Sequence, residues 1–132
     1  MNVLFYMRTP GIREDDLLRA VAPFVSRGSL EVFADLESFA GRVRRPKDLP
    51  SVALIWNPTK DDLRALASLR VLLGGGRILL VLPDQEEETI ALAHRVRPAY
   101  ITYVDEGISG VVSVLTRLAG NAGDTAAGAR RR

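Results

Sequence analysis

One short segment of the sequence brings together residue types that could bind an anionic ligand. Asn57, Thr59 and Lys60 supply an amide, a hydroxyl and an ammonium group, and Arg8 adds a guanidinium group from earlier in the chain. Anions bind such donors, above all at the N-terminus of a helix. If the protein binds a small molecule or a nucleotide, we expect its anion site at these four residues. The simpler alternative is that Asn57 and Pro58 form a turn and that Thr59 caps a helix.

Other residue types exclude much of the chemistry that enzymes use. The chain has no cysteine, which excludes disulfides, thiolate nucleophiles and thiolate metal ligands. Its one histidine, His94, cannot build a zinc site alone. The run Gly74–Gly76 precedes an apolar run, whereas phosphate-binding loops follow a strand and open a helix. We therefore expect no enzymatic activity, no cofactor and no bound metal.

The charge of the chain is concentrated at its end. Residues 120–132 contain three of the 18 basic residues and one of the 16 acidic residues, so residues 1–119 have no net charge. A neutral domain gives little support for nucleic-acid binding, which needs a basic face. Weak, non-specific contact of Arg130–Arg132 with phosphates is a third and lesser hypothesis. The start of the chain lacks a secretion signal and no run is long enough to span a membrane, so we expect a cytoplasmic protein.

Five short apolar runs predict five strands, separated by five amphipathic segments that predict helices. The strands are expected at Val3–Met7, Leu30–Ala34, Val52–Trp56, Ile78–Leu82 and Tyr100–Val104, and the helices at Glu14–Ser26, Leu36–Arg45, Lys60–Leu73, Glu86–Arg97 and Ile108–Leu118. Pro23 predicts a break in the first helix. Thr59 to Asp62 and Asp84 to Glu87 are typical of helix starts.

This alternation predicts a three-layer α/β sandwich with one five-stranded parallel sheet. The second run contains Glu31 and suits an edge strand, which favours the flavodoxin-like strand order 2-1-3-4-5. We expect one domain over residues 1–119 and a disordered Gly/Ala/Arg tail over residues 120–132. In such a sheet, ligands bind beyond the carboxyl ends of the strands.

The chain resembles the receiver domains of two-component response regulators. The resemblance rests on Pro50–Trp56, which is similar to the third strand of that family, and on Asp84–Ala93 and Pro98–Ile101, which are similar to its fourth helix and fifth strand. It implies a signalling domain in a regulatory pathway. Receivers accept a phosphoryl group on an aspartate that ends the third strand, with Mg²⁺ held by an acidic pair after the first strand.

The residues that align with this phosphorylation pocket are of other types. The acidic pair becomes Met7 and Arg8, and the phosphoacceptor becomes Trp56, or Asn57 with a shift of one residue. The family's hydroxyl residue aligns with Pro83. Its lysine aligns with Asp105, or with Val104 after a shift of one residue. An amide or an indole is no nucleophile, and Mg²⁺ needs oxygen ligands. The resemblance therefore implies a degenerate receiver that cannot be phosphorylated.

The family also uses the face formed by its fourth helix, fifth strand and fifth helix for protein contacts. Tyr100, Tyr103 and His94 fall on the matching segments, and tyrosine is a good interface residue. Tyr100 and Tyr103 are three residues apart and should lie on opposite faces of the sheet. The main hypothesis is thus a protein-binding module, with a homodimer as one form of the complex. A second basic cluster lies at the end of the second predicted helix and consists of Arg42, Arg44, Arg45 and Lys47. These residues either stabilise the C-terminus of that helix through its dipole or form a patch for an acidic partner.

Overall fold

The structure, a computed structural model, describes residues 3–7, 14–25, 30–44, 52–73 and 77–127. The described residues form a five-stranded sheet in the order β2-β1-β3-β4-β5, with every neighbouring pair parallel. Its strands are β1 (Val3–Met7), β2 (Leu30–Phe33), β3 (Val52–Trp56), β4 (Arg77–Leu82) and β5 (Tyr100–Tyr103). The predicted strand order, the parallel sheet and the edge position of the second strand are confirmed.

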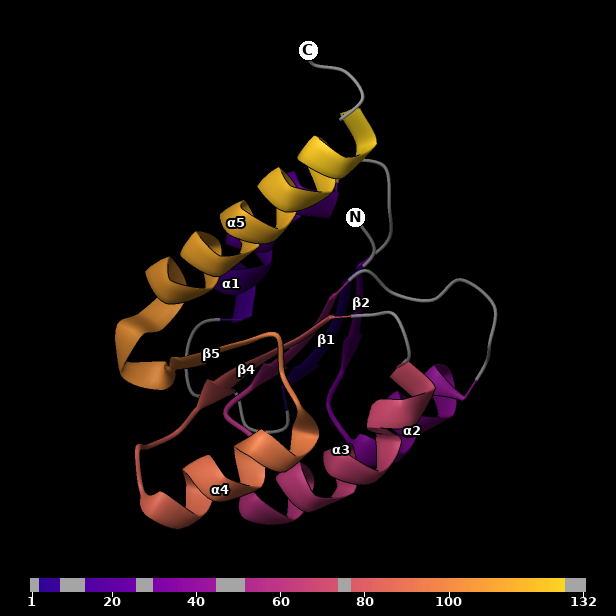
Figure 1. Ribbon diagram of the computed structural model, residues 1–132, viewed down its shortest axis with the longest axis vertical. Helices are drawn as coiled ribbons and strands as arrows, with labels where there is room; N and C mark the ends of the chain where they lie inside the picture. The colour runs from indigo at the N-terminus through magenta and orange to yellow at the C-terminus, as the bar shows by residue number, and fades with distance from the viewer. Residues whose placement is uncertain (1–2, 8–13, 26–29, 45–51, 74–76, 128–132) are drawn as a thin grey trace.

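Helices cover both faces of this sheet. They are α1 (Glu14–Val21), α2 (Leu36–Val43), α3 (Lys60–Leu73), α4 (Glu87–Val96) and α5 (Gly107–Ala127), with short 3-10 helices η1 (Ala22–Val25) and η2 (Val104–Glu106). Figure 1 shows α1 and α5 together on one face and α2, α3 and α4 on the other. The three-layer α/β sandwich is therefore confirmed.

Two apolar clusters hold the layers together, because successive strand residues point to opposite faces. Leu4, Tyr6 and Ile55 pack in the cluster under α2, α3 and α4. Phe5 and Trp56 pack in the cluster under α1 and α5. Every residue of β1 and β3 is buried, as expected for central strands that are covered on both sides. The residues of the edge strand β2 are half-buried or exposed.

The helix boundaries follow local signals. α1 ends at Val21 and the chain continues as η1, which contains Pro23, so the predicted break is confirmed. α3 starts with a reciprocal cap between Thr59 and Asp62, also as predicted. The side chain of Asp35 caps α2 by accepting a hydrogen bond from the amide of Ser38 at 2.7 Å. This cap stabilises the first turn of α2.

Some boundaries differ from the sequence prediction. β5 ends at Tyr103 because Val104 starts η2, and Gly107 then turns the chain into α5 with a φ of 66°, a conformation that favours glycine. The backbone of α5 is helical to Ala127, which extends this helix beyond its predicted end at Leu118. The disorder expected for the tail stays a prediction. Residues 128–132 and Gly74–Gly76 lie outside the described residues.

Within the part of the chain that the structure describes, no helix has the length and apolar character needed to cross a membrane.

Candidate functional site at the carboxyl ends of the strands

The residues that follow the strands decide what the carboxyl edge of the sheet can do. Asn57 follows β3, Pro83 follows β4, and Val104 and Asp105 follow β5. Met7 is the last residue of β1 and is buried. Arg8, the remaining member of the predicted degenerate pocket and of the predicted anion site, lies outside the described residues.

The side chain of Trp56 is part of the hydrophobic core at the end of β3. Its Cα is in register with Met7 of β1 and with Val81 of β4, so it occupies the centre of the sheet. Its side chain is fully buried in the apolar cluster under α1 and α5. Among the described residues, its indole Nε1 has no hydrogen-bond partner. At this position the side chain contributes packing, and it offers no carboxylate to a phosphoryl group.

Asn57 makes the turn that leaves the strand. Its φ is 55°, in the left-handed region that asparagine tolerates better than most residues. Its backbone N–H donates to the carbonyl oxygen of Val81 at 2.8 Å, which extends the pairing with β4 by one bond. Asn57 is half-buried, and the following Pro58 is buried. This geometry agrees with the turn that the sequence offered as the alternative to an anion ligand.

Thr59 caps the N-terminus of α3. Its hydroxyl accepts a hydrogen bond from the amide of Asp62 at 3.0 Å, while the Asp62 carboxylate accepts one from the amide of Thr59 at 3.1 Å. Asp62 is 1% exposed, so a carboxylate already sits where a helix N-terminus would attract an anion. The hydroxyl and the positive end of this helix thus serve the fold.

Lys60 is paired with acidic residues that precede and begin α4. Its Nζ lies 3.1 Å from Glu88 Oε1 and 3.5 Å from Glu86 Oε1. The hydrogen bond and the charge of Glu88, with a smaller contribution from Glu86, raise the pKa of Lys60 above 10.5. Because these carboxylates share its charge, Lys60 has less to offer a bound anion. In the described contacts Thr59 caps α3 and Lys60 pairs with Glu86 and Glu88, and the anion site stays a prediction.

The residues after β4 lack the hydroxyl that receivers use. Pro83 is exposed and has no donor. Asp84 accepts a hydrogen bond from the amide of Glu86 at 3.0 Å and forms the turn before α4. The hydroxyl of Thr89 and then this amide favour the charged form of the carboxyl, so the pKa of Asp84 lies below its ordinary 3.8.

The end of β5 carries an acid instead of a lysine. Asp105 is exposed in η2. Nearby, the buried Thr102 donates its hydroxyl hydrogen to Glu106 Oε1 at 2.9 Å, and both side chains pack closely against Gly110 of α5. No set of three or more His, Asp or Glu side chains that could hold a metal ion occurs among the residues described.

Tyr100 and Tyr103 lie on opposite faces of the edge strand, as their spacing predicts. Tyr100 packs against the cluster under α1 and α5, and Tyr103 packs against the cluster under α2, α3 and α4. Both rings are half-buried, which leaves part of each available at the sheet edge. His94 is exposed in the last turn of α4.

The basic cluster after α2 is only partly described. Arg42 is paired with Glu31 of β2, with Nε 3.0 Å from Oε2 and 3.1 Å from Oε1, so it joins α2 to the edge strand. Arg44 is exposed. Arg45 and Lys47 lie outside the described residues.

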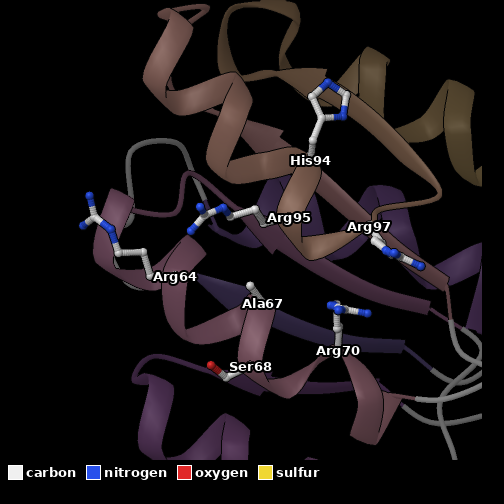
Figure 2. Close-up of a pocket in the computed structure, with 7 residues that line it drawn as sticks. All are labelled: Arg64, Ala67, Ser68, Arg70, His94, Arg95 and Arg97. Carbon is white, nitrogen blue, oxygen red and sulfur yellow. The ribbon is translucent and has the colours of Figure 1, made fainter.

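A different basic feature, which sequence reasoning missed, lies between α3 and α4. A groove of about 630 Å³ is lined by Arg64, Ala67, Ser68 and Arg70 of α3, and by His94, Arg95 and Arg97 from the α4 side (Figure 2). We call it the arginine groove. Its residues come from two helices that become neighbours only because β3 and β4 pair. The predicted strand order already implies that these two helices are neighbours. Finding the groove from the sequence would also have required assigning each arginine to a face of its helix.

Comparison with known proteins agrees with the fold. The strand order and layers are those of the flavodoxin-like α/β fold that receiver domains share. The sequence matches no protein-family model and no curated protein.

Among solved structures, a pilus assembly-related protein from Burkholderia pseudomallei is similar with a TM-score of 0.68 and 22% identity, covering 91% of this chain and 90% of that chain. A CpaE pilus assembly protein from Burkholderia thailandensis is similar with a TM-score of 0.67 and 21% identity, over 91% of this chain and 98% of that one. A response regulator from Burkholderia pseudomallei that carries a phosphorylated aspartic acid has a TM-score of 0.67 and 13% identity, over 98% and 75% of the respective chains. The receiver-like fold is thereby confirmed.

Proposed function

We propose that this chain is a receiver-like signalling domain that is not phosphorylated and acts through protein contacts. The observation that carries the proposal is the end of β3, where a fully buried Trp56 is followed by the turn residue Asn57. Neither side chain is a nucleophile toward phosphorus, because the indole and the amide lack a basic lone pair.

The residues around this position support the same proposal. The segment 8–13, which follows β1, contains no Asp or Glu, so the acidic pair that would hold Mg²⁺ is missing from the sequence there. Pro83 and Asp105 replace the hydroxyl and the lysine that would contact a phosphoryl group. The negative charge of Asp105 would repel a phosphoryl group, whereas a lysine would stabilise it.

Phosphotransfer from a small donor tests the proposal directly. The purified chain is incubated with acetyl phosphate and Mg²⁺, and its intact mass is measured alongside a receiver domain of known activity. We expect the control domain to gain one phosphoryl group and this chain to keep its mass. A stoichiometric gain that is lost on acid or hydroxylamine treatment of the acyl phosphate would overturn the proposal.

We place the contact surface of this module at α4, β5 and α5. The support is that β5 is an edge strand, with Tyr100 and Tyr103 only half-buried, and that His94 is exposed on α4. An edge strand offers unpaired backbone groups to a second chain, and a second copy is one such partner. Sedimentation velocity over a range of concentrations should show association, with hydrogen exchange of the β5 amides slowing at the same time. Association without any protection of β5 would place the contact elsewhere.

The process in which the module works is proposed from the two structural neighbours named as pilus assembly proteins. Both cover nearly the whole chain, so the likeness concerns the complete domain. We propose a role in assembling a surface pilus. Deletion of the gene should reduce the number of pili seen by electron microscopy. Expression of the unchanged chain, with Trp56 and Asn57, should restore that number. An unchanged number of pili would contradict this role.

A further inference from the structure

The arginine groove concentrates positive charge on the helical surface over β3 and β4. Four arginines line it: Arg64 and Arg70 from α3, and Arg95 and Arg97 from the α4 side. No acidic side chain is among the described residues that line it. Figure 2 shows Arg70 and Arg97 at the same end of the groove, with Arg70 carried by α3 and Arg97 by the segment after α4.

Three of these arginines have no counter-charge within the described part of the chain. Arg64 is engaged, with Nη1 2.8 Å from Asp61 Oδ1 and Nη2 3.3 Å from Glu88 Oε2. By contrast, Arg70, Arg95 and Arg97 form no ion pair with any described residue. Arg95 and Arg97 are exposed and Arg70 is half-buried. Guanidinium groups stay charged at all physiological pH values, so their mutual repulsion is permanent.

Helix dipoles explain only part of this arrangement. Arg70 and Arg95 lie in the last turns of α3 and α4, where positive charge is favourable. Arg97 follows α4 as its cap residue, in the left-handed conformation with a φ of 58°. A dipole argument places one cation on each helix end, and the packing of α3 beside α4 brings these ends together. The resulting groove has four arginines and no acidic side chain among its described lining residues, so a negatively charged ligand would relieve their mutual repulsion.

We propose that the arginine groove binds an acidic segment of a protein partner. Arginine forks match carboxylates with paired hydrogen bonds. Between the arginines the groove is lined by two small residues of α3, Ala67 and Ser68. This surface lies on the α3–α4 side of the molecule, and the proposal does not depend on whether the strand ends can be phosphorylated.

The adjoining surface favours a protein over a nucleic acid. Ser68 also lines a second groove of about 390 Å³ between α2 and α3. Its lining is mainly apolar, with Leu36, Ala40, Ala65 and Leu69, and includes one acidic and one basic residue, Glu37 and Arg44. An apolar lining suits the side chains of a protein, whereas it offers little to a phosphate backbone. No Phe, Tyr or Trp is among the described residues lining either groove, so His94 is the one aromatic ring there that could stack on a base.

An NMR titration tests this proposal. The isotope-labelled chain is titrated with a peptide rich in glutamate and leucine, and in parallel with single-stranded DNA and inorganic polyphosphate of equal charge. We expect saturable amide shifts in residues 64–70 and 94–97 with the peptide, with affinity falling as salt is raised. Tighter binding of DNA or polyphosphate than of the peptide would overturn the acidic-protein assignment, and an absence of shifts in these residues with all three probes would overturn the site.

Charge-removing variants locate the binding. The double variant Arg70→Gln with Arg97→Gln should weaken peptide binding about tenfold, since each exposed pairing contributes a few-fold. The double variant Arg19→Gln with Arg117→Gln also removes two exposed arginines, from α1 and α5 on the opposite face of the sheet (Figure 1), and serves as the matched control. Circular dichroism confirms that each variant is folded. An equal loss of affinity in the control and the double variant would contradict the assignment to the groove.

Discussion

Replacing Trp56 with alanine tests whether the end of β3 is packed core or an open pocket. The side chain is 0% exposed and packs in the cluster under α1 and α5. A buried tryptophan removes about 150–250 Å² from water, worth about 4–6 kcal/mol at 25 cal/mol per Å² as an upper value. Measured truncations of this kind cost about 3–5 kcal/mol. We expect Trp56→Ala to lower the free energy of unfolding by about 4 kcal/mol.

Two further variants make this test specific. Trp56→Phe keeps the ring and removes the buried Nε1–H, which has no partner among the described residues, so its cost should stay below about 2 kcal/mol. Val71→Ala changes an apolar side chain that is 74% exposed and should alter stability by less than about 0.5 kcal/mol.

Urea unfolding followed by far-ultraviolet circular dichroism measures all three variants, because Trp56 is the only tryptophan and its fluorescence is lost on substitution. If Trp56→Ala costs no more than Val71→Ala, the end of β3 is not part of the core and the reasoning fails.

Three other outcomes follow from positions around the site. Asn57→Gly should leave stability unchanged or raise it, whereas Asn57→Ala should cost about 1 kcal/mol because of the positive φ; equal effects in urea unfolding would contradict the turn role. Gly110→Ala should destabilise by about 1–3 kcal/mol, since its Cβ would lie 2.7 Å from Thr102 Oγ1, while Gly41→Ala, with open space around it, should stabilise by up to about 1 kcal/mol; the same sign for both would refute the packing argument. Asp84 has a pKa below 3.8 in the folded state, so it stabilises the fold above its unfolded pKa and loses this effect as the pH falls through its folded pKa; the stability difference between wild type and Asp84→Asn should therefore shrink in acid, and a difference that grows would contradict the sign.

The sheet was predictable because its signals are local. The unbroken apolar runs of β1 and β3 require cover on both faces, and Glu31 marks β2 as an edge. The cap between Thr59 and Asp62 is also predictable from four consecutive residues. Such features depend on spacing within one segment, which the sequence displays directly.

The chemistry of the surface was less predictable because its partners are distant in sequence. The ion pairs of Lys60 with Glu86 and Glu88, which follow it by 26 and 28 residues, become visible only in the fold. The arginine groove depends in the same way on α3 and α4 packing together. No local pattern reports which charges meet across two helices.

The most direct test of the central claim is an amide NMR titration with Mg²⁺ followed by beryllofluoride, which mimics the phosphoryl group of an aspartyl phosphate. A chain whose strand ends offer Trp56 and Asn57 in place of an aspartate should show no saturable shifts at Met7, Asn57 or Asp105. Saturable shifts at these amides would show that an acidic pocket exists at the strand ends, and the protein would then be a working phosphorylation switch.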